Sequence, residues 1–120
     1  MAAAGGPALF EMSVAEARAA LKEMTRAMDV ARAEVRRVED RHVPGPNGEV
    51  TIRIYRPLAG AGSNTLPILM LYHGGGFALG DIETHDNVAR FYCARAGVIV
   101  INVDYRRSPE HKFPAGVEDC

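Results

Sequence analysis

Three consecutive glycines follow directly after an apolar run, and their backbone is the sharpest chemical feature of the sequence. The segment reads His73-Gly74-Gly75-Gly76-Phe77 and comes after residues 68–71, all of which are apolar. Residues without side chains let a ligand approach the backbone and let successive N–H groups turn toward one point. In a parallel sheet, ligands bind outside the carboxyl ends of the strands. The pattern therefore predicts a backbone cradle for an anionic group, either an oxyanion or a phosphate.

A phosphate site is one of the open interpretations of these glycines. Gly74, Gly76 and Gly80 fit a loose version of the glycine spacing of dinucleotide sites, and Asp104 stands where a ribose-binding acid would lie. A pyrophosphate site also needs a helix that begins within the glycines, so that its N-terminus faces the phosphate. Residues 77–83 are typical of a loop, so the helix begins too late. A purely structural tight turn is the other alternative, and the adjoining histidine favours a functional role over it.

A βαβ unit must position this turn. The continuous apolar runs at residues 68–71 and 98–101 indicate strands buried on both faces of a parallel sheet. Between them, Thr84 has the side chain of a helix N-cap, and Gly97 stands where a glycine relieves a left-handed C-cap. A right-handed crossover then places the helix over one face of the sheet.

Two further elements precede this unit. Residues 35–43 indicate a charged strand near a sheet edge, and residues 50–54 alternate between apolar and polar types. The turn-forming residues 44–48 join them, which predicts a hairpin. Residues 59–65 predict a surface loop.

An amphipathic helix is expected near the start of the chain. Ser13 and Glu16 have the spacing of a capping box. Apolar side chains then recur at steps of three and four, which favours a helix packed on the rest of the protein through this stripe. The stripe comprises Val14, Ala17, Leu21, Met24 and Met28.

Composition excludes several classes of protein. The 120 residues carry 14 Lys and Arg against 15 Asp and Glu, so no electrostatic footprint for nucleic acid is present. The longest apolar run, residues 66–72, is far short of the ~20 residues that cross a bilayer. No Lys or Arg precedes Arg18, so a secretory signal is not expected and the predicted location is cytoplasmic. Cys93 and Cys120 are predicted to be free thiols, and no spacing indicates a metal site.

Several motifs around the βαβ unit occur in an order that identifies a family. Together they resemble the hormone-sensitive-lipase-like family of the α/β-hydrolase fold, from about residue 35 to residue 120. Arg107 and Ser108 stand where that family typically carries Leu and Ala. The motifs are His73-Gly74-Gly75-Gly76-Phe77, Gly80-Asp81, His85-Asp86, Asp104-Tyr105-Arg106, Pro109-Glu110-His111 and Phe113-Pro114-Ala115.

The resemblance implies a serine carboxylesterase or lipase that acts on small-molecule esters with short to medium acyl chains. It implies a Ser-Asp-His triad, no metal or organic cofactor, and an N-terminal helix that belongs to a cap. The N–H groups of Gly75 and Gly76 would form part of the oxyanion hole, and such donors are commonly worth about 3 kcal/mol each. His73 and Gly74 would shape the loop rather than react.

The sequence lacks the Gly-x-Ser-x-Gly elbow that carries the nucleophile in this fold. Its serines, Ser13, Ser63 and Ser108, have no flanking glycines at the required offsets. We therefore expect an incomplete α/β-hydrolase fold, with an N-terminal cap helix region over residues 1–33. The N-terminal part of the core would occupy residues 34–120, with the triad downstream of Cys120.

Two consequences follow from an incomplete fold. The 120 residues alone should be inactive, and the strand at residues 68–72 should form an exposed apolar edge through which the chain self-associates. A non-catalytic module of the same fold that binds small molecules remains an alternative, as does a dinucleotide-binding βαβ unit.

Overall fold

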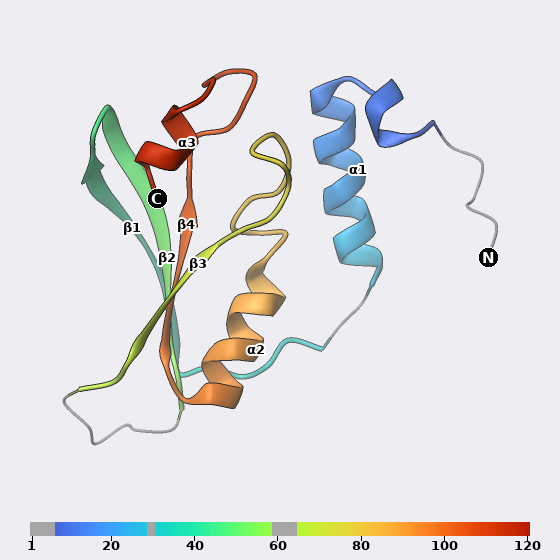
Figure 1. Ribbon diagram of the computed structural model, residues 1–120. Coiled ribbons are helices and arrows are strands. Elements are labelled where there is room, and N and C mark those ends of the chain that lie inside the picture. The colour runs from blue at the N-terminus through green and yellow to red at the C-terminus, as the bar shows by residue number, and fades with distance from the viewer. Residues whose placement is uncertain (1–6, 29–30, 59–64) are drawn as a thin grey trace.

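One mixed sheet of four strands, in the order β1-β2-β4-β3, organises the chain (Figure 1). The computed structural model describes residues 7–28, 31–58 and 65–120. The strands are β1 (Arg37–Gly45), β2 (Gly48–Arg56), β3 (Ile68–Tyr72) and β4 (Ile99–Asp104). The helices are the 3-10 turn η1 (Leu9–Glu11), α1 (Val14–Ala27), α2 (Asp86–Ala96) and α3 (Ala115–Glu118).

The predicted hairpin is confirmed. β1 and β2 pair antiparallel from Arg37 opposite Arg56 to Gly45 opposite Gly48, and β1 lies at the edge of the sheet. Gly48 has φ +130°, a backbone conformation that glycine adopts without strain. The first strand begins two residues later than predicted and continues to Gly45, because the cross-strand ladder extends to the turn.

The βαβ unit is also confirmed. β3 and β4 pair in parallel, and α2 connects them and ends at Gly97, which has φ +65°. The N-cap prediction for Thr84 is wrong, since the helix begins at Asp86 after His85. The hydroxyl of Thr84 instead accepts a hydrogen bond from the N–H of Asp81 and donates one to the Asp81 carbonyl. The threonine therefore closes the turn before the helix rather than capping it.

Hydrophobic packing occupies both faces of the sheet. Ala89 and Cys93 of α2 pack on Tyr55 and Val100, and all four are fully buried. On the opposite face, a second cluster contains Val50, Val103 and Tyr105. Because side chains alternate along a strand, the odd spacing from Val100 to Val103 places the two clusters on opposite faces.

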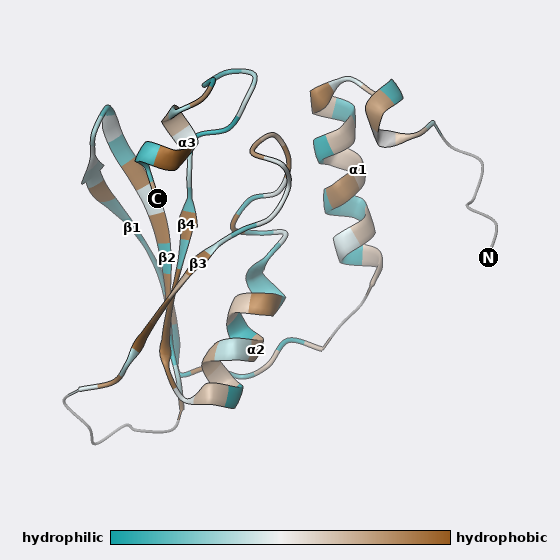
Figure 2. Cartoon of the chain, viewed as in Figure 1, coloured by the Kyte–Doolittle hydropathy of each residue, from teal (hydrophilic) through white to brown (hydrophobic). Residues whose placement is uncertain are grey.

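Burial of β3 differs from the sequence prediction. Leu69 and Leu71 pack against the cluster beneath α2, but Ile68, Met70 and Tyr72 are 60%, 46% and 44% exposed. The prediction of a strand buried on both faces is therefore wrong for β3, although β4 is largely buried. β3 is an edge strand, and the other described elements leave its second face open (Figure 2).

Helix α1 begins as predicted but packs differently. Ser13 and Glu16 form the reciprocal capping box. The expected packing through the apolar stripe is wrong at its end, since Met24 and Met28 are 52% and 61% exposed, and Ala17 is the buried residue of the helix. Polar contacts from Arg18 and Lys22 hold α1 against the loop between β3 and α2 instead (Figure 1).

Two sequence predictions fall partly on residues that the structure does not describe. Of the predicted loop at residues 59–65, residues 59–64 lie outside the described residues, as do residues 1–6 of the expected cap region. Within residues 7–28, 31–58 and 65–120, no helix combines the length and the hydrophobicity that a membrane span requires.

Candidate active site

The glycine turn leaves the carboxyl end of β3 and borders a hollow of about 370 Å³. The ends of β3 and β4 lie at the same edge of the sheet because the two strands are parallel. The four residues predicted to form or shape the oxyanion hole, His73 to Gly76, are consecutive in the chain, and all of them line this hollow. The lining comprises Tyr72, His73, Gly74, Gly75, Gly76, Phe77, Tyr105, Val117 and Cys120.

The turn has a backbone path that requires glycine at Gly75. Its φ is +137°, and a Cβ there would lie 2.0 Å from the carbonyl oxygen of Leu79. The Gly75 carbonyl accepts hydrogen bonds from the N–H groups of Ala78 and Leu79, at 3.1 and 2.8 Å. Gly76 follows with φ +60° and open space around the Cβ position. The chain thus folds back on itself closely at Gly75 and not at Gly76.

The backbone N–H groups of the three glycines differ in their partners. Gly74 donates to Nε2 of His85 at 3.3 Å. Within the part of the chain that the structure describes, the N–H groups of Gly75 and Gly76 have no hydrogen-bond partner. Both residues are exposed and line the hollow. Two amide donors are therefore available to a ligand at the position predicted for the oxyanion hole, while the third is engaged.

His73 is enclosed at the base of the turn. Its side chain is fully buried, stacks on the ring of Tyr105 with centroids 4.2 Å apart, and has Nδ1 3.2 Å from the Gly74 carbonyl. The hydroxyl of Tyr105 donates to the His73 carbonyl at 2.5 Å. Asp104 Oδ1 lies 3.7 Å from Nε2 of His73. These contacts favour the predicted loop-shaping role of His73, which stays a prediction.

A short polar chain links the turn to the segment before α2. Thr84 Oγ1 lies 3.1 Å from Nδ1 of His85, whose Nε2 receives the Gly74 N–H. Burial lowers the pKa of His85 below its usual value, and the neighbouring His73 lowers it further. His85 is therefore neutral at pH 7 and can accept this hydrogen bond. From the sequence, His85 was named only as part of the motif His85-Asp86.

The loop that carries Arg107 and Ser108 is tied to the glycine loop. Arg107 donates to the carbonyl of Gly80, and the N–H of Ser108 donates to the carbonyl of Phe77 at 2.7 Å. From α1, Arg18 donates to the carbonyls of Ala78 and Ser108, at 2.8 and 2.9 Å. Arg18 was not singled out from the sequence. The sequence offers one indication of a role for Arg18, which is its position next to Ala17 of the apolar stripe. No local pattern indicates its distant partners.

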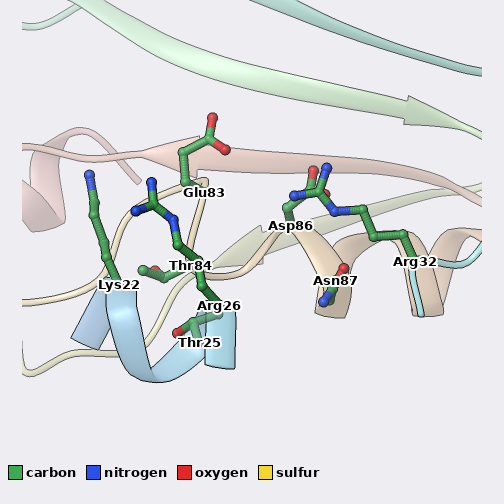
Figure 3. A pocket seen from close by; sticks show the side chains of 8 residues that line it. All are labelled: Lys22, Thr25, Arg26, Arg32, Glu83, Thr84, Asp86 and Asn87. Atoms are coloured by element: carbon green, nitrogen blue, oxygen red, sulfur yellow. The ribbon is translucent and has the colours of Figure 1, made fainter. Parts of the chain in front are cut away.

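Another hollow of about 380 Å³ lies between α1 and the start of α2 (Figure 3). Its charged groups already face partners of opposite charge. Lys22 lies 2.8 Å from Asp81, and Arg32 lies 3.7 Å from Asp86. The carboxylate of Asp86, which also accepts a hydrogen bond from Tyr55, occupies the N-terminal turn of α2. The Asp86 side chain thus already occupies the start of α2 that a pyrophosphate would face, with Arg90 as its ion-pair partner.

The described residues contain neither an activated nucleophile nor a metal cluster. Ser13 caps α1 and Ser108 Oγ donates to the carbonyl of His111, whereas Ser63 lies outside the described residues. Burial raises the pKa values of the Cys93 and Cys120 thiols, which disfavours the reactive thiolate. No group of three or more His, Cys, Asp or Glu side chains suited to a metal ion occurs among the described residues.

Comparison with known proteins finds similarity to part of several ester hydrolases. Residues 69–120 match the family described as alpha/beta hydrolase fold. The carboxylic ester hydrolase LipN of Mycobacterium tuberculosis is 48% identical over 83 residues, which cover 69% of this chain and 21% of LipN. Esterase LipI of the same organism is 38% identical over 114 residues, which cover 92% of this chain and 35% of LipI.

A solved structure extends the similarity to three dimensions. An ester hydrolase from the metagenome of Lake Arreo, in complex with a derivative of bipyridine phosphonate, matches with a TM-score of 0.88 and 41% identity. The match covers 96% of this chain and 36% of that chain. This chain therefore spans about a fifth to a third of the length of the proteins it resembles.

Proposed function

We propose that this chain, whose residues 69–120 match the alpha/beta hydrolase fold family, forms the oxyanion-hole part of a carboxylic ester hydrolase. The observation that carries the proposal is the pair of unpartnered N–H groups at Gly75 and Gly76, beside the hollow at the end of β3. A tetrahedral acyl intermediate bears negative charge on one oxygen, and preorganised backbone donors stabilise that charge.

The expected chemistry is attack on the ester carbonyl by a serine, assisted by a histidine and an aspartate. We propose that these three groups belong to sequence outside the 120 residues, because the chain spans only a fifth to a third of its relatives. In this fold the N–H after the nucleophile supplies the remaining oxyanion donor. Short to medium acyl esters are the proposed substrates, and no cofactor is needed for this reaction.

Two observations support this assignment over the alternatives. The helix after the glycines begins only at Asp86, nine residues beyond Phe77 and with its own carboxylate in the first turn, which disfavours a dinucleotide. The Lake Arreo hydrolase binds a phosphonate derivative. A phosphonate carries anionic oxygens around a tetrahedral atom, so it resembles the charge that the Gly75 and Gly76 donors would stabilise.

A chimera tests the proposal directly. In it, this chain replaces the matching segment of the Lake Arreo ester hydrolase, and hydrolysis of a short-chain nitrophenyl ester is measured. We expect turnover from the chimera, none from the 120-residue chain alone, and a loss of kcat on the order of 100-fold or more for Gly75→Val. A folded but inactive chimera would contradict the proposal and favour the non-catalytic binding module.

A further inference from the structure

Among the described residues, His85 is the one that accepts a hydrogen bond from a glycine N–H of the turn. Its Nε2 accepts from Gly74 at 3.3 Å, and its Nδ1 lies 3.1 Å from the hydroxyl oxygen of Thr84. No other acceptor for the Gly74 N–H occurs among the described residues. The ring therefore bridges the glycine turn and the segment that leads into α2.

The hydrogen bonds around Thr84 decide which nitrogen of His85 carries the proton. The Thr84 hydroxyl donates to the Asp81 carbonyl and accepts from the Asp81 N–H, both at 2.9 Å. Its proton is thus used, and its remaining lone pair can only accept from Nδ1–H of His85. In that tautomer Nε2 carries no proton, so it can accept the hydrogen bond from the Gly74 N–H.

We propose that neutral His85 is a positioning residue, which fixes the orientation of Gly74 and thereby presents the N–H groups of Gly75 and Gly76 to the oxyanion. The inference rests on the proposed function. Protonation of the ring would place N–H against N–H at Gly74 and release the start of the turn. The bonds from Ala78 and Leu79 to the Gly75 carbonyl do not involve the ring and would remain. The expected effect is a misaligned turn rather than an unfolded one.

The surroundings of the ring favour the neutral form. Burial is the main cause that lowers the pKa of His85, and His73, with its ring centroid 5.6 Å away, is the second. Asp81 acts in the opposite direction, first through a hydrogen bond to its backbone and then through its carboxylate, which is paired with Lys22 of α1 at 2.8 Å. On the segment of His85 itself, Glu83 pairs with Arg53, and Asp86 pairs with Arg90.

The contact can be tested in the 120-residue chain without any catalysis. Between pH 8 and pH 5, the ring ¹⁵N shifts of His85 report its tautomer, and the amide shift of Gly74 reports the hydrogen bond. We expect an Nδ1–H tautomer at pH 7 and a Gly74 amide shift that follows the titration of His85. An Nε2–H tautomer, or a Gly74 amide that does not respond, would overturn the proposal.

Substitutions separate positioning from simple folding. His85→Gln keeps an acceptor near the position of Nε2 and does not titrate, whereas His85→Phe keeps a ring and removes the acceptor. In the chimera we expect His85→Gln to retain kcat at pH 7 within about threefold, and His85→Phe to lose at least tenfold in kcat with little change in KM. His42→Gln, an exposed histidine on β1, is the matched control.

The outcomes distinguish this inference from the proposed function. A His85→Phe chimera with full kcat would overturn the role of His85 while leaving the esterase proposal standing. If every chimera were inactive, the esterase proposal would fail, and the ¹⁵N and amide titrations alone would support or overturn the contact. Should His85→Phe not fold, the pH titration of the unsubstituted chain and the His85→Gln variant still decide.

Discussion

Arg18 of α1 donates two hydrogen bonds to the carboxylate of Glu110, 92 positions further along the chain, at 2.7 and 2.9 Å. The same guanidinium donates to the carbonyls of Ala78 and Ser108. One side chain thus connects the N-terminal helix to both loops beside the glycine turn. Because Met24 and Met28 leave much of the helix's apolar stripe exposed, this polar contact is a principal attachment of α1.

Arg18→Ala should therefore loosen α1 and lower the free energy of unfolding by about 2 kcal/mol, since hydrogen bonds from a charged donor are lost and carbonyls are left without partners. Urea unfolding and hydrogen exchange of the α1 amides measure this. Arg26→Ala is the control, because Arg26 is largely exposed and pairs with Glu23 on its own helix. Equal effects of the two substitutions would contradict the attachment through Arg18.

The Arg18–Glu110 pair should also make stability depend on acid pH. The hydrogen bond from Arg18 lowers the pKa of Glu110 from 4.5 to about 2. A carboxyl whose pKa is lower in the folded state stabilises that state above its unfolded pKa, and the contribution disappears as pH falls through the folded pKa. We expect the Tm difference between the unsubstituted chain and Glu110→Gln to be largest above pH 5 and to vanish near pH 2. A difference that is constant with pH would contradict this.

Gly75 and Gly76 should respond differently to alanine. At Gly76, Ala meets open space at φ +60°, so the cost is about 1–2 kcal/mol of left-handed strain. At Gly75, the added Cβ also meets the Leu79 carbonyl oxygen at 2.0 Å, so the loop must move and the loss is larger. Thermal unfolding of both variants measures the difference, with Gly48→Ala, at φ +130° in open space, as the control. Equal losses at the two positions would show that the close turn is not required.

The exposed edge of the sheet should make the 120-residue chain self-associate. β3 lies at the edge of the sheet, and Ile68 and Met70 expose apolar surface beside its unpaired backbone groups. Size-exclusion chromatography with light scattering should detect oligomers that Met70→Lys reduces. Met28→Lys, which adds the same charge at the C-cap of α1, should have little effect. A stable monomer at micromolar concentration would contradict the expectation.

Local chemistry was sufficient to predict the elements and their order. The capping box at Ser13, the turn at residues 44–48 and the left-handed cap at Gly97 each depend on neighbours within a few residues. The βαβ unit follows from two apolar runs with a helix between them, since parallel strands need such a crossover. These features could be predicted because the interactions that specify them are close in sequence.

Burial and side-chain partners were predicted less well. The apolar composition of β3 suggested that both faces are covered, although coverage depends on which elements lie beside it. Thr84 has a side chain suited to an N-cap, but its hydroxyl is hydrogen-bonded to the backbone N–H and carbonyl of Asp81 instead. The stripe on α1 has the right period for packing, but the helix meets the loops through Arg18 and Lys22 instead.

The sequence by itself determined that three glycines end a strand of a βαβ unit, because periodicity, glycine and turn residues act over short distances. Only the tertiary structure decided which of their N–H groups has a partner. His85 is eleven positions from Gly74, and Arg18 is sixty from Ala78. Hydrogen bonds over such separations depend on how the elements are arranged in space, and no local pattern of residue types encodes that arrangement.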